Sequence, residues 1–192
     1  MYLARVRSDR YPDGAHVEMP ADEADALIGA DVLSYARFDE HGRVGVLELA
    51  PGQPTKALPL WFVEVVESSA RPPATNLVAF TGHDVAPWTL LDNLDVGRTG
   101  VSSEAQLGAV RWYPATGEID QIYVAPRWRR RSIATTLLIL ASALSLARDW
   151  RSLWSDGQRT VLGETFRNAF EWGDRAAELT HVSPPMTPAD AG

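Results

Sequence analysis

Cysteine is absent from this chain of 192 residues. The protein therefore forms no disulfide and no thiolate metal site, and it has no cysteine nucleophile. Its four histidines, His16, His41, His83 and His181, lack the paired spacing that histidine metal ligands show. We expect no metal site.

Long apolar segments are missing as well. No stretch approaches the roughly 18 to 20 apolar residues that a membrane-spanning helix needs, and the first residues, Met1 to Arg5, do not resemble a signal peptide. Apolar residues make up 45% and charged residues 22% of the chain, as in ordinary soluble proteins. We expect a cytoplasmic protein that does not bind membranes.

Lysine is represented by Lys56 alone, and arginine supplies the rest of the 18 basic residues. With 25 acidic residues the formal net charge is −7, which disfavours broad electrostatic attraction to nucleic acid. A local basic site is still compatible with this composition, so the charge excludes only general binding to nucleic acid.

The first half of the chain is predicted to form mainly strands. Alternating segments at 31–38 and 43–49 flank a turn at 39–42, a pattern typical of a β-hairpin. Two further strands and one short helix are expected at 2–7, 58–66 and 20–28. The segment 68–105 is less regular, with a short strand expected at 77–80 and a helical turn at 88–94. It either carries acceptor-binding loops or is an irregular connection that packs on the core.

The second half has a clearer pattern. Residues 107–113 and 118–124 are predicted to be antiparallel strands around a tight turn. Pro126 ends the second strand, an arginine-rich stretch follows, and Ser132 is a suitable N-cap for a long, buried helix that runs toward Trp150. The remaining expected elements are a strand at 151–155, a helix at 160–170, a strand at 177–182 and a mobile tail at 184–192.

A strand that ends beside an arginine-rich helix start is suited to binding a pyrophosphate. The first backbone N–H groups of a helix have no intrahelical acceptor and point toward an anion placed there. The helix dipole favours the anion by about 0.3–1 kcal/mol, and arginine side chains add charge-assisted hydrogen bonds. This part of the chain therefore predicts a cofactor that contains phosphate.

The same stretch resembles the GNAT acetyltransferase superfamily. The signature of that family is a strand of the form I-x-x-I-x-V-x-P, a basic linker, and Arg/Gln-x-x-Gly-x-Gly/Ala at the helix start. The residues that match are Ile119, Ile122, Val124, Pro126, Arg129, Ile133 and Ala134. Ser132 departs from the signature, because it stands where the family usually has a glycine that lets the backbone approach the phosphates closely. The resemblance extends over about 106–170.

The resemblance implies an α/β fold of the α+β kind, with a mixed, mostly antiparallel central sheet flanked by helices. It implies a single domain over 1–183, in which 1–105 is a variable half and 106–183 binds acyl-CoA, with acetyl-CoA as the acyl donor. The main chain of Ile122, Tyr123 and Val124 is expected to lie along the pantetheine arm. The residues expected at the pyrophosphate are Arg129, Arg130, Arg131, Ser132, Ile133 and Ala134.

The resemblance also suggests catalytic residues. In one branch of the family the general base is the glutamate of a Glu-Ile pair, equivalent to Glu118 here, and Asp120 is the alternative because alternation puts it on the same face. The usual general acid is a tyrosine on the helix after the splayed strand. Phe166 and Phe170 occupy that region in this chain, so acid assistance is expected to be absent or to come from solvent.

The leading hypothesis is an enzyme that transfers an acetyl group from acetyl-CoA to the amine of a small molecule or a protein by direct attack. One alternative is a GNAT-like module without turnover that serves in binding or structure. Another is a GNAT-like protein that modifies nucleic-acid bases, with Arg127 and Arg130 near the phosphates. The enzyme hypothesis requires the strands at 118–124 and 151–155 to part beside a carboxylate. Formation of a homodimer is left open.

Overall fold

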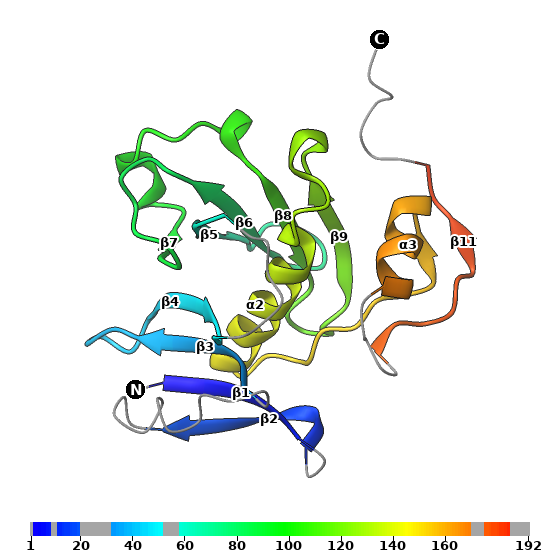
Figure 1. Ribbon diagram of the computed structural model, residues 1–192, viewed down its shortest axis with the longest axis horizontal. Helices are drawn as coiled ribbons and strands as arrows, with labels where there is room; N and C mark the ends of the chain where they lie inside the picture. The colour runs from blue at the N-terminus through cyan, green and yellow to red at the C-terminus, as the bar shows by residue number, and fades with distance from the viewer. Residues whose placement is uncertain (1, 9–10, 20–31, 52–57, 170–174, 185–192) are drawn as a thin grey trace.

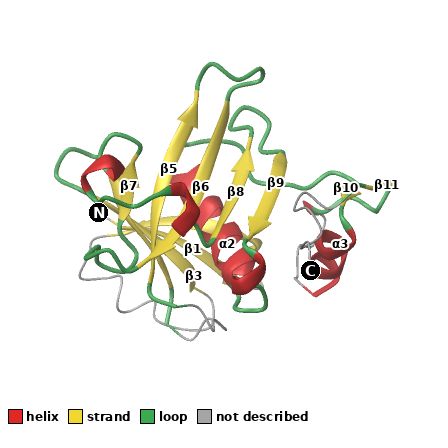
Figure 2. Ribbon diagram, turned by 90° about the horizontal axis from the view of Figure 1, so that it is seen from above, coloured by secondary structure: helices red, strands yellow, loops and turns green. Residues whose placement is uncertain are grey.

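The computed structural model of the protein describes residues 2–8, 11–19, 32–51, 58–169 and 175–184. Two β-sheets lie on either side of one long helix, α2 (Ile133–Ala147), and a smaller group of elements lies at one side of the molecule (Figures 1 and 2). The fold is of the α+β kind with a mostly antiparallel central sheet, as the sequence predicts.

The N-terminal sheet is antiparallel throughout. Its strands, in spatial order, are β2 (Tyr11–Met19), β1 (Tyr2–Ser8), β3 (Val32–Phe38) and β4 (Val44–Leu49). Asp39 closes the predicted hairpin between β3 and β4, because its carboxylate accepts hydrogen bonds from the backbone N–H groups of His41 (2.8 Å) and Arg43 (2.9 Å). An aspartate that binds nearby backbone in this way stabilises a tight turn.

The central sheet has five strands. In spatial order they are β7 (Leu90–Asp92), β5 (Leu60–Glu67), β6 (Ala74–Thr81), β8 (Gly108–Trp112) and β9 (Ile119–Val124). Neighbouring strands are antiparallel except for β7, which is parallel to β5. The strand β9 lies at one edge of this sheet, so one side of its backbone is left without a neighbouring strand of the sheet.

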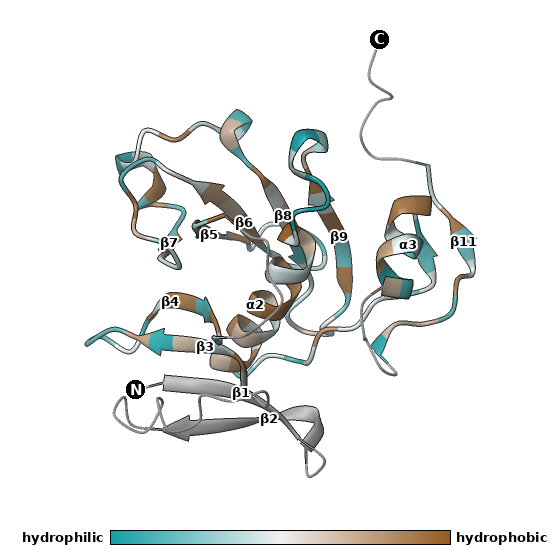
Figure 3. Ribbon diagram, in the orientation of Figure 1, coloured by the Kyte–Doolittle hydropathy of each residue, from teal (hydrophilic) through white to brown (hydrophobic). Residues whose placement is uncertain are grey.

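Helix α2 is apolar along most of its length (Figure 3), as suits a helix that is covered on two sides. It contacts β8 of the central sheet and both β3 and β4 of the N-terminal sheet. Leu137, Leu140 and Leu144 are fully buried, and burying one leucine side chain contributes about 1.5–3 kcal/mol. One hydrophobic core therefore includes α2 and faces of both sheets. Neither α2 nor another helix in the described part of the chain is long and apolar enough to cross a membrane.

The opposite, outer face of the central sheet is covered by the segment that follows β6. A second apolar cluster on this face contains Trp61, Val63 and Phe80, and the rings of Trp61 and Phe80 stack with centroids 4.8 Å apart. The segment 82–106 packs against this cluster and includes β7 and two short 3-10 helices, η2 (Val96–Arg98) and η3 (Ser103–Ala105). It therefore forms the outer layer of the sheet.

Beside β9 lies a small group of three elements (Figure 1), namely β10 (Gln158–Arg159), α3 (Val161–Ala169) and β11 (His181–Val182). The strands β10 and β11 are parallel. The guanidinium of Arg159, which is 9% exposed, donates hydrogen bonds to Glu164 (2.8 Å) and to the backbone carbonyl oxygens of Asp156 and Ala177. A buried arginine thus holds this group together.

Two predicted elements are corrected by the structure. Residues 88–94, expected as a helical turn, contain β7, because backbone bonds from Trp88 to Leu60 (2.6 Å) and from Phe62 to Thr89 (2.8 Å) draw the chain to the edge of β5. The strand expected at 151–155 is reduced to isolated bridges at its end.

One predicted strand is longer in the structure, one observed strand was not predicted, and several predictions concern residues outside the described ranges. The strand expected at 77–80 is part of the longer β6, and β2 was not predicted. The helix expected at 20–28, Phe170 and residues 185–192 of the tail lie outside the described residues.

We predict that Arg148→Ala lowers the free energy of unfolding by about 1.5–3 kcal/mol. Arg148 follows the last residue of α2 and pairs with Glu64 of β5, with 2.6 Å between Nη2 and Oε2. Glu64 is 7% exposed, so the substitution leaves a buried carboxylate unpaired. Urea denaturation measures the change, and Arg98→Ala, at an exposed position, is the control. A loss below about 0.5 kcal/mol would contradict the role given to this pair.

Candidate functional site

The start of β9 is joined to the chain beyond α2 at a single point. Glu118 forms a parallel bridge with Trp154, in which the N–H of Ile119 donates to the carbonyl of Trp154 (2.8 Å) and the N–H of Trp154 donates to the carbonyl of Gly117 (2.9 Å). The next residue, Ser155, pairs with Ala176 instead. The two strands therefore part beyond Glu118, and no described strand pairs with the free edge of β9 after this point.

A β-bulge lies just after this bridge. In the pairing of β8 with β9, Trp112 faces Ile119 and Arg111 faces Gln121, so Asp120 is the extra residue. A bulge bends its strand and redirects side chains, and bulges are frequent beside active sites. Here the bulge places Asp120 on the outer face of the sheet, where it contacts Arg111.

The loop after β9 has an unusual backbone. A 3-10 turn, η4 (Pro126–Trp128), is followed by Arg130 with φ of +62° and Ser132 with φ of +59°. Ser132 therefore adopts the left-handed conformation that glycine takes without strain. It precedes α2 as the sequence predicts, yet its side chain makes no capping hydrogen bond. The uncapped start of α2 thus keeps backbone N–H groups for an anion.

The arginines of this loop are held in different ways. Arg129 donates from Nε to the carbonyl oxygen of Val124 (3.2 Å), so this carbonyl is directed toward the free edge of β9. Arg127 and Arg131 contact the Trp128 ring, with the guanidinium carbons 5.9 and 5.2 Å from its centroid. A cation over an aromatic face gains about 0.5–1 kcal/mol at an exposed site. Trp128 therefore orders the basic loop while it packs against the core.

Glu118 lies where the two strands meet. It is half-buried, and among the described residues none donates a hydrogen bond to its carboxylate. The backbone N–H of Glu118 binds the Thr116 hydroxyl oxygen (3.2 Å). The carboxylate is therefore open to accept a proton from a ligand, as a general base must be.

Asp120, the alternative base, is bound by two side chains. One of its oxygens accepts a hydrogen bond from Arg111 (2.6 Å) and the other from the Tyr113 hydroxyl (2.7 Å). The bond to Asp120 raises the pKa of Tyr113 above its ordinary value of 10.0, so the phenol stays protonated at neutral pH. The carboxylate of Asp120 is therefore held by two side chains, whereas no described residue donates a hydrogen bond to the carboxylate of Glu118.

Arg111 extends this group across the outer face of the sheet. Its guanidinium also binds Glu67 at the end of β5 (2.8 Å), and Glu67 accepts a further bond from Asn76 (2.6 Å). The hydrogen bond to Glu67 is the largest cause that raises the pKa of Arg111. The bonds from Arg111 and Asn76 lower the pKa of Glu67 from 4.5. This network holds the bulged part of β9 against β8, β6 and β5.

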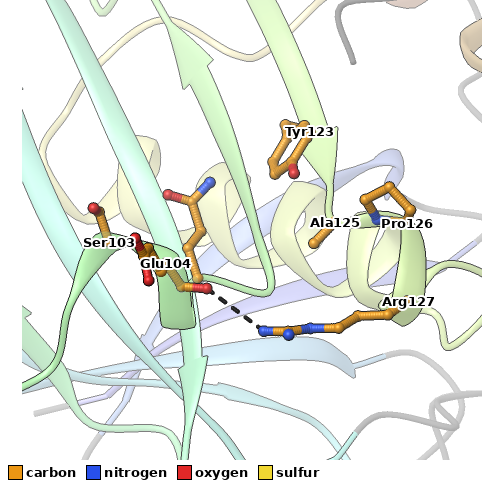
Figure 4. Close-up of a pocket in the computed structure, with 7 residues that line it drawn as sticks. Ser103, Glu104, Tyr123, Ala125, Pro126 and Arg127 are labelled. Carbon is orange, nitrogen blue, oxygen red and sulfur yellow. Dashed lines mark hydrogen bonds between the residues drawn. The ribbon is translucent and has the colours of Figure 1, made fainter. Parts of the chain in front are cut away.

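A pocket of about 430 Å³ lies near the other end of β9 and is open to solvent. Its lining residues come from η3 and the residue beyond it, and from the end of β9 and η4 (Figure 4); they are Ser103, Glu104, Gln106, Tyr123, Ala125, Pro126 and Arg127. The Arg127 side chain reaches across toward the backbone carbonyl of Glu104, at 3.5 Å. The segment 82–106 thus supplies one wall of a pocket, in addition to packing on the core.

The described residues fit an acyl-CoA molecule in two respects. The free edge of β9 can pair with an extended chain that carries amide groups, as another strand would. The left-handed loop and the uncapped start of α2 suit a diphosphate. Arg129 would have to release the Val124 carbonyl for a ligand to bind that oxygen. The residues expected at the cofactor therefore belong to this edge, Ile122 to Val124, and to this loop and helix start, Arg129 to Ala134.

Sequence reasoning missed the bulge, the network around Arg111 and the pocket. A bulge changes the pairing by one residue and leaves no mark in the apolar pattern. Glu67 and Arg111 are 44 positions apart, and only the order of the strands brings them together. The polar residue Arg111 between Val110 and Trp112 was the one available signal, since it indicates an outward position.

We predict that Ser132→Gly raises the free energy of unfolding by about 0.5 kcal/mol, because glycine relieves a left-handed conformation that costs other residues roughly 1 kcal/mol. Ser132→Val is the matched opposite, with an expected loss of about 1 kcal/mol or more because a β-branched side chain tolerates this conformation poorly. Urea denaturation measures both. A glycine variant less stable than the wild type would show that Ser132 does not adopt a positive φ.

We predict that the stabilising effect of Glu67 depends on pH. Its pKa is lowered by folding, so its contribution is present above the unfolded value near 4.5 and is lost as the pH falls below it. At pH 7, Glu67→Gln should cost about 0.5–1 kcal/mol, a modest value because the carboxylate is partly exposed. Urea titrations of both proteins between pH 7 and about 3 should converge at the acid end. Glu178→Gln, at an exposed position, should show no such convergence.

Comparison with known proteins agrees with this geometry. Residues 72–160 match the model of the acetyltransferase (GNAT) family, just under half of the chain. The comparisons with curated proteins and with solved structures gave no match. The matched part runs from β6 through the bulged β9, the arginine loop and α2 to β10, and it begins earlier than the 106–170 of the sequence resemblance. Over residues 72–160 the chain therefore matches the GNAT acetyltransferase family.

Proposed function

We propose that the protein is an N-acyltransferase that moves an acetyl group from acetyl-CoA to an amine acceptor by direct attack. The observation that carries this proposal is the left-handed loop before α2, in which Ser132 has a positive φ, a conformation that glycine adopts without strain. Serine thus stands in a backbone conformation that suits glycine, at the position where the family signature has glycine. This supports the proposal that the loop binds a diphosphate despite the substitution.

The donor is held, in this proposal, by three parts of the chain. The free edge of β9 at Ile122 and Val124 pairs with the pantetheine amides. The backbone at Ser132 to Ala134 and the guanidinium groups of Arg129 to Arg131 bind the diphosphate. Acetyl-CoA supplies a thioester whose carbonyl carbon an amine can attack and whose thiolate can leave.

Glu118 acts as the general base in this proposal. Its carboxylate takes the proton that the acceptor amine loses, directly or through one water. Asp120 stays bound to Arg111 and Tyr113 and keeps the bulge in position. The leaving thiolate takes its proton from solvent, because the sequence of α3, Val161–Ala169, contains no tyrosine.

Calorimetric titration with acetyl-CoA tests the donor site. We expect micromolar affinity in the wild type and loss of binding in the double variant Arg129→Ala, Arg131→Ala, because two charge-assisted contacts are removed. The control is the double variant Arg43→Ala, Arg98→Ala, which removes the same charge from exposed positions. No binding at millimolar acetyl-CoA would refute the proposal and favour a module without turnover.

The same proposal predicts the effect of Glu118→Gln. Acetyl-CoA binding should be unchanged, while kcat/KM for an accepted amine should fall by about 100-fold or more, the usual contribution of a general base. A variant with unchanged kcat/KM would show that another group accepts the proton. Asp120→Asn is the comparison, and its loss should be accompanied by lower stability because it breaks the contacts with Arg111 and Tyr113.

A further inference from the structure

A partly exposed tryptophan lies beside Glu118, where β9 meets the chain beyond α2. Trp154 is the residue that forms the parallel bridge with Glu118. Neighbouring strands lie about 4.7–4.9 Å apart, and residues paired across them have their side chains on the same side. The indole of Trp154 is therefore adjacent to the Glu118 carboxylate, and 37% of the residue is exposed to solvent.

The surface that these two side chains border is the one away from the core. Ile119 follows Glu118 and Leu153 precedes Trp154, and both of these neighbours are buried in the core cluster. Successive side chains of an extended chain point in opposite directions. Glu118 and Trp154 therefore point away from the core together, so a ligand that reaches the carboxylate from solvent also meets the tryptophan ring.

The ring of Trp154 is held in place by the hairpin turn between β8 and β9. Its Nε1 donates a hydrogen bond to the backbone carbonyl of Thr116 (3.1 Å), and its backbone N–H donates to the carbonyl of Gly117 (2.9 Å). A Cβ at Gly117 would overlap the carbonyl oxygen of Ser152, so the turn and the chain before Trp154 are closely packed. A ring that is ordered in advance loses little conformational entropy when a ligand packs on it.

We propose that Trp154 determines acceptor specificity by packing against a flat, aromatic group close to the amine of the acceptor. The proposal rests on the N-acyltransferase function proposed above. When the nitrogen of the acceptor reaches the Glu118 carboxylate, the group next to it lies against the indole, because the two side chains are one strand spacing apart. An aromatic group gains both burial and ring stacking there, and a hydroxyl group gains neither.

Steady-state kinetics with 2-phenylethylamine and ethanolamine test this specificity. Both probes carry a primary amine on a two-carbon chain, and they differ in the phenyl or hydroxyl group at the other end. For the wild type we expect KM for 2-phenylethylamine to be lower by about tenfold. In Trp154→Ala that KM should rise to the value for ethanolamine, while kcat, KM for ethanolamine and the affinity for acetyl-CoA change little.

Two further variants separate the ring from its hydrogen bond. Trp154→Phe keeps an aromatic ring without the N–H donor and should keep most of the preference. Trp154→Gln has a side-chain amide that can donate to Thr116 but no ring, and it should lose the preference as Trp154→Ala does. Leu94→Ala, which removes an apolar side chain that is 85% exposed in the outer layer, is the control and should leave the ratio of the two KM values unchanged.

The outcomes that overturn the inference differ from those that overturn the proposed function. If Trp154→Ala or Trp154→Gln changes both KM values by the same factor, or if the wild type has no preference, Trp154 has only a structural role and the proposed function stands. If the wild type binds acetyl-CoA and acetylates neither amine, the inferred acceptor class is wrong. If the wild type does not bind acetyl-CoA, the proposed function fails and the inference fails with it.

Discussion

The burial of α2 between two sheets is the constraint on which the site depends. Its leucines pack between the central sheet and the N-terminal sheet. A shift of the helix would expose apolar surface, which costs a free energy of about 25 cal/mol for each Å². The pair of Glu64 with Arg148 further restrains the end of the helix. Because the helix is held in this way, its uncapped first turn stays beside the end of β9.

Around that fixed helix, the edge strand β9 connects two kinds of chemistry. Its free edge and the loop at Ser132 suit an extended, anionic ligand, whereas its outer face carries the network of Arg111 and, near Tyr123, one wall of the pocket. The bulge at Asp120 lies between them and is held by Arg111 and Tyr113. A single strand thus carries both the free edge proposed for the donor and the side-chain network that holds the bulge in place.

Much of this arrangement follows from local patterns. Local patterns predicted the hairpin at Asp39, the hairpin whose turn contains Gly117, the buried helix and the basic loop before that helix. They could do so because turn residues and apolar periodicity act over a few positions. Residues 88–94 were misassigned as a helical turn because they contain the strand β7. This strand is stabilised by pairing with residues of β5 that lie 28 positions earlier in the chain. Tertiary pairing overrides local preference in short segments of this kind.

The sequence by itself determined the family resemblance, the order of the elements around α2 and the residues proposed to bind a phosphate, since all of these lie within one contiguous stretch. Only the tertiary structure decided that Ser132 takes a left-handed backbone and that Glu118 is open while Asp120 is paired. It also decided that Arg127 lines a pocket, whereas Arg129 binds the backbone carbonyl of Val124. These properties depend on contacts between strands and loops far apart in the chain, and such contacts form only when the strand order and the bulge have set the register.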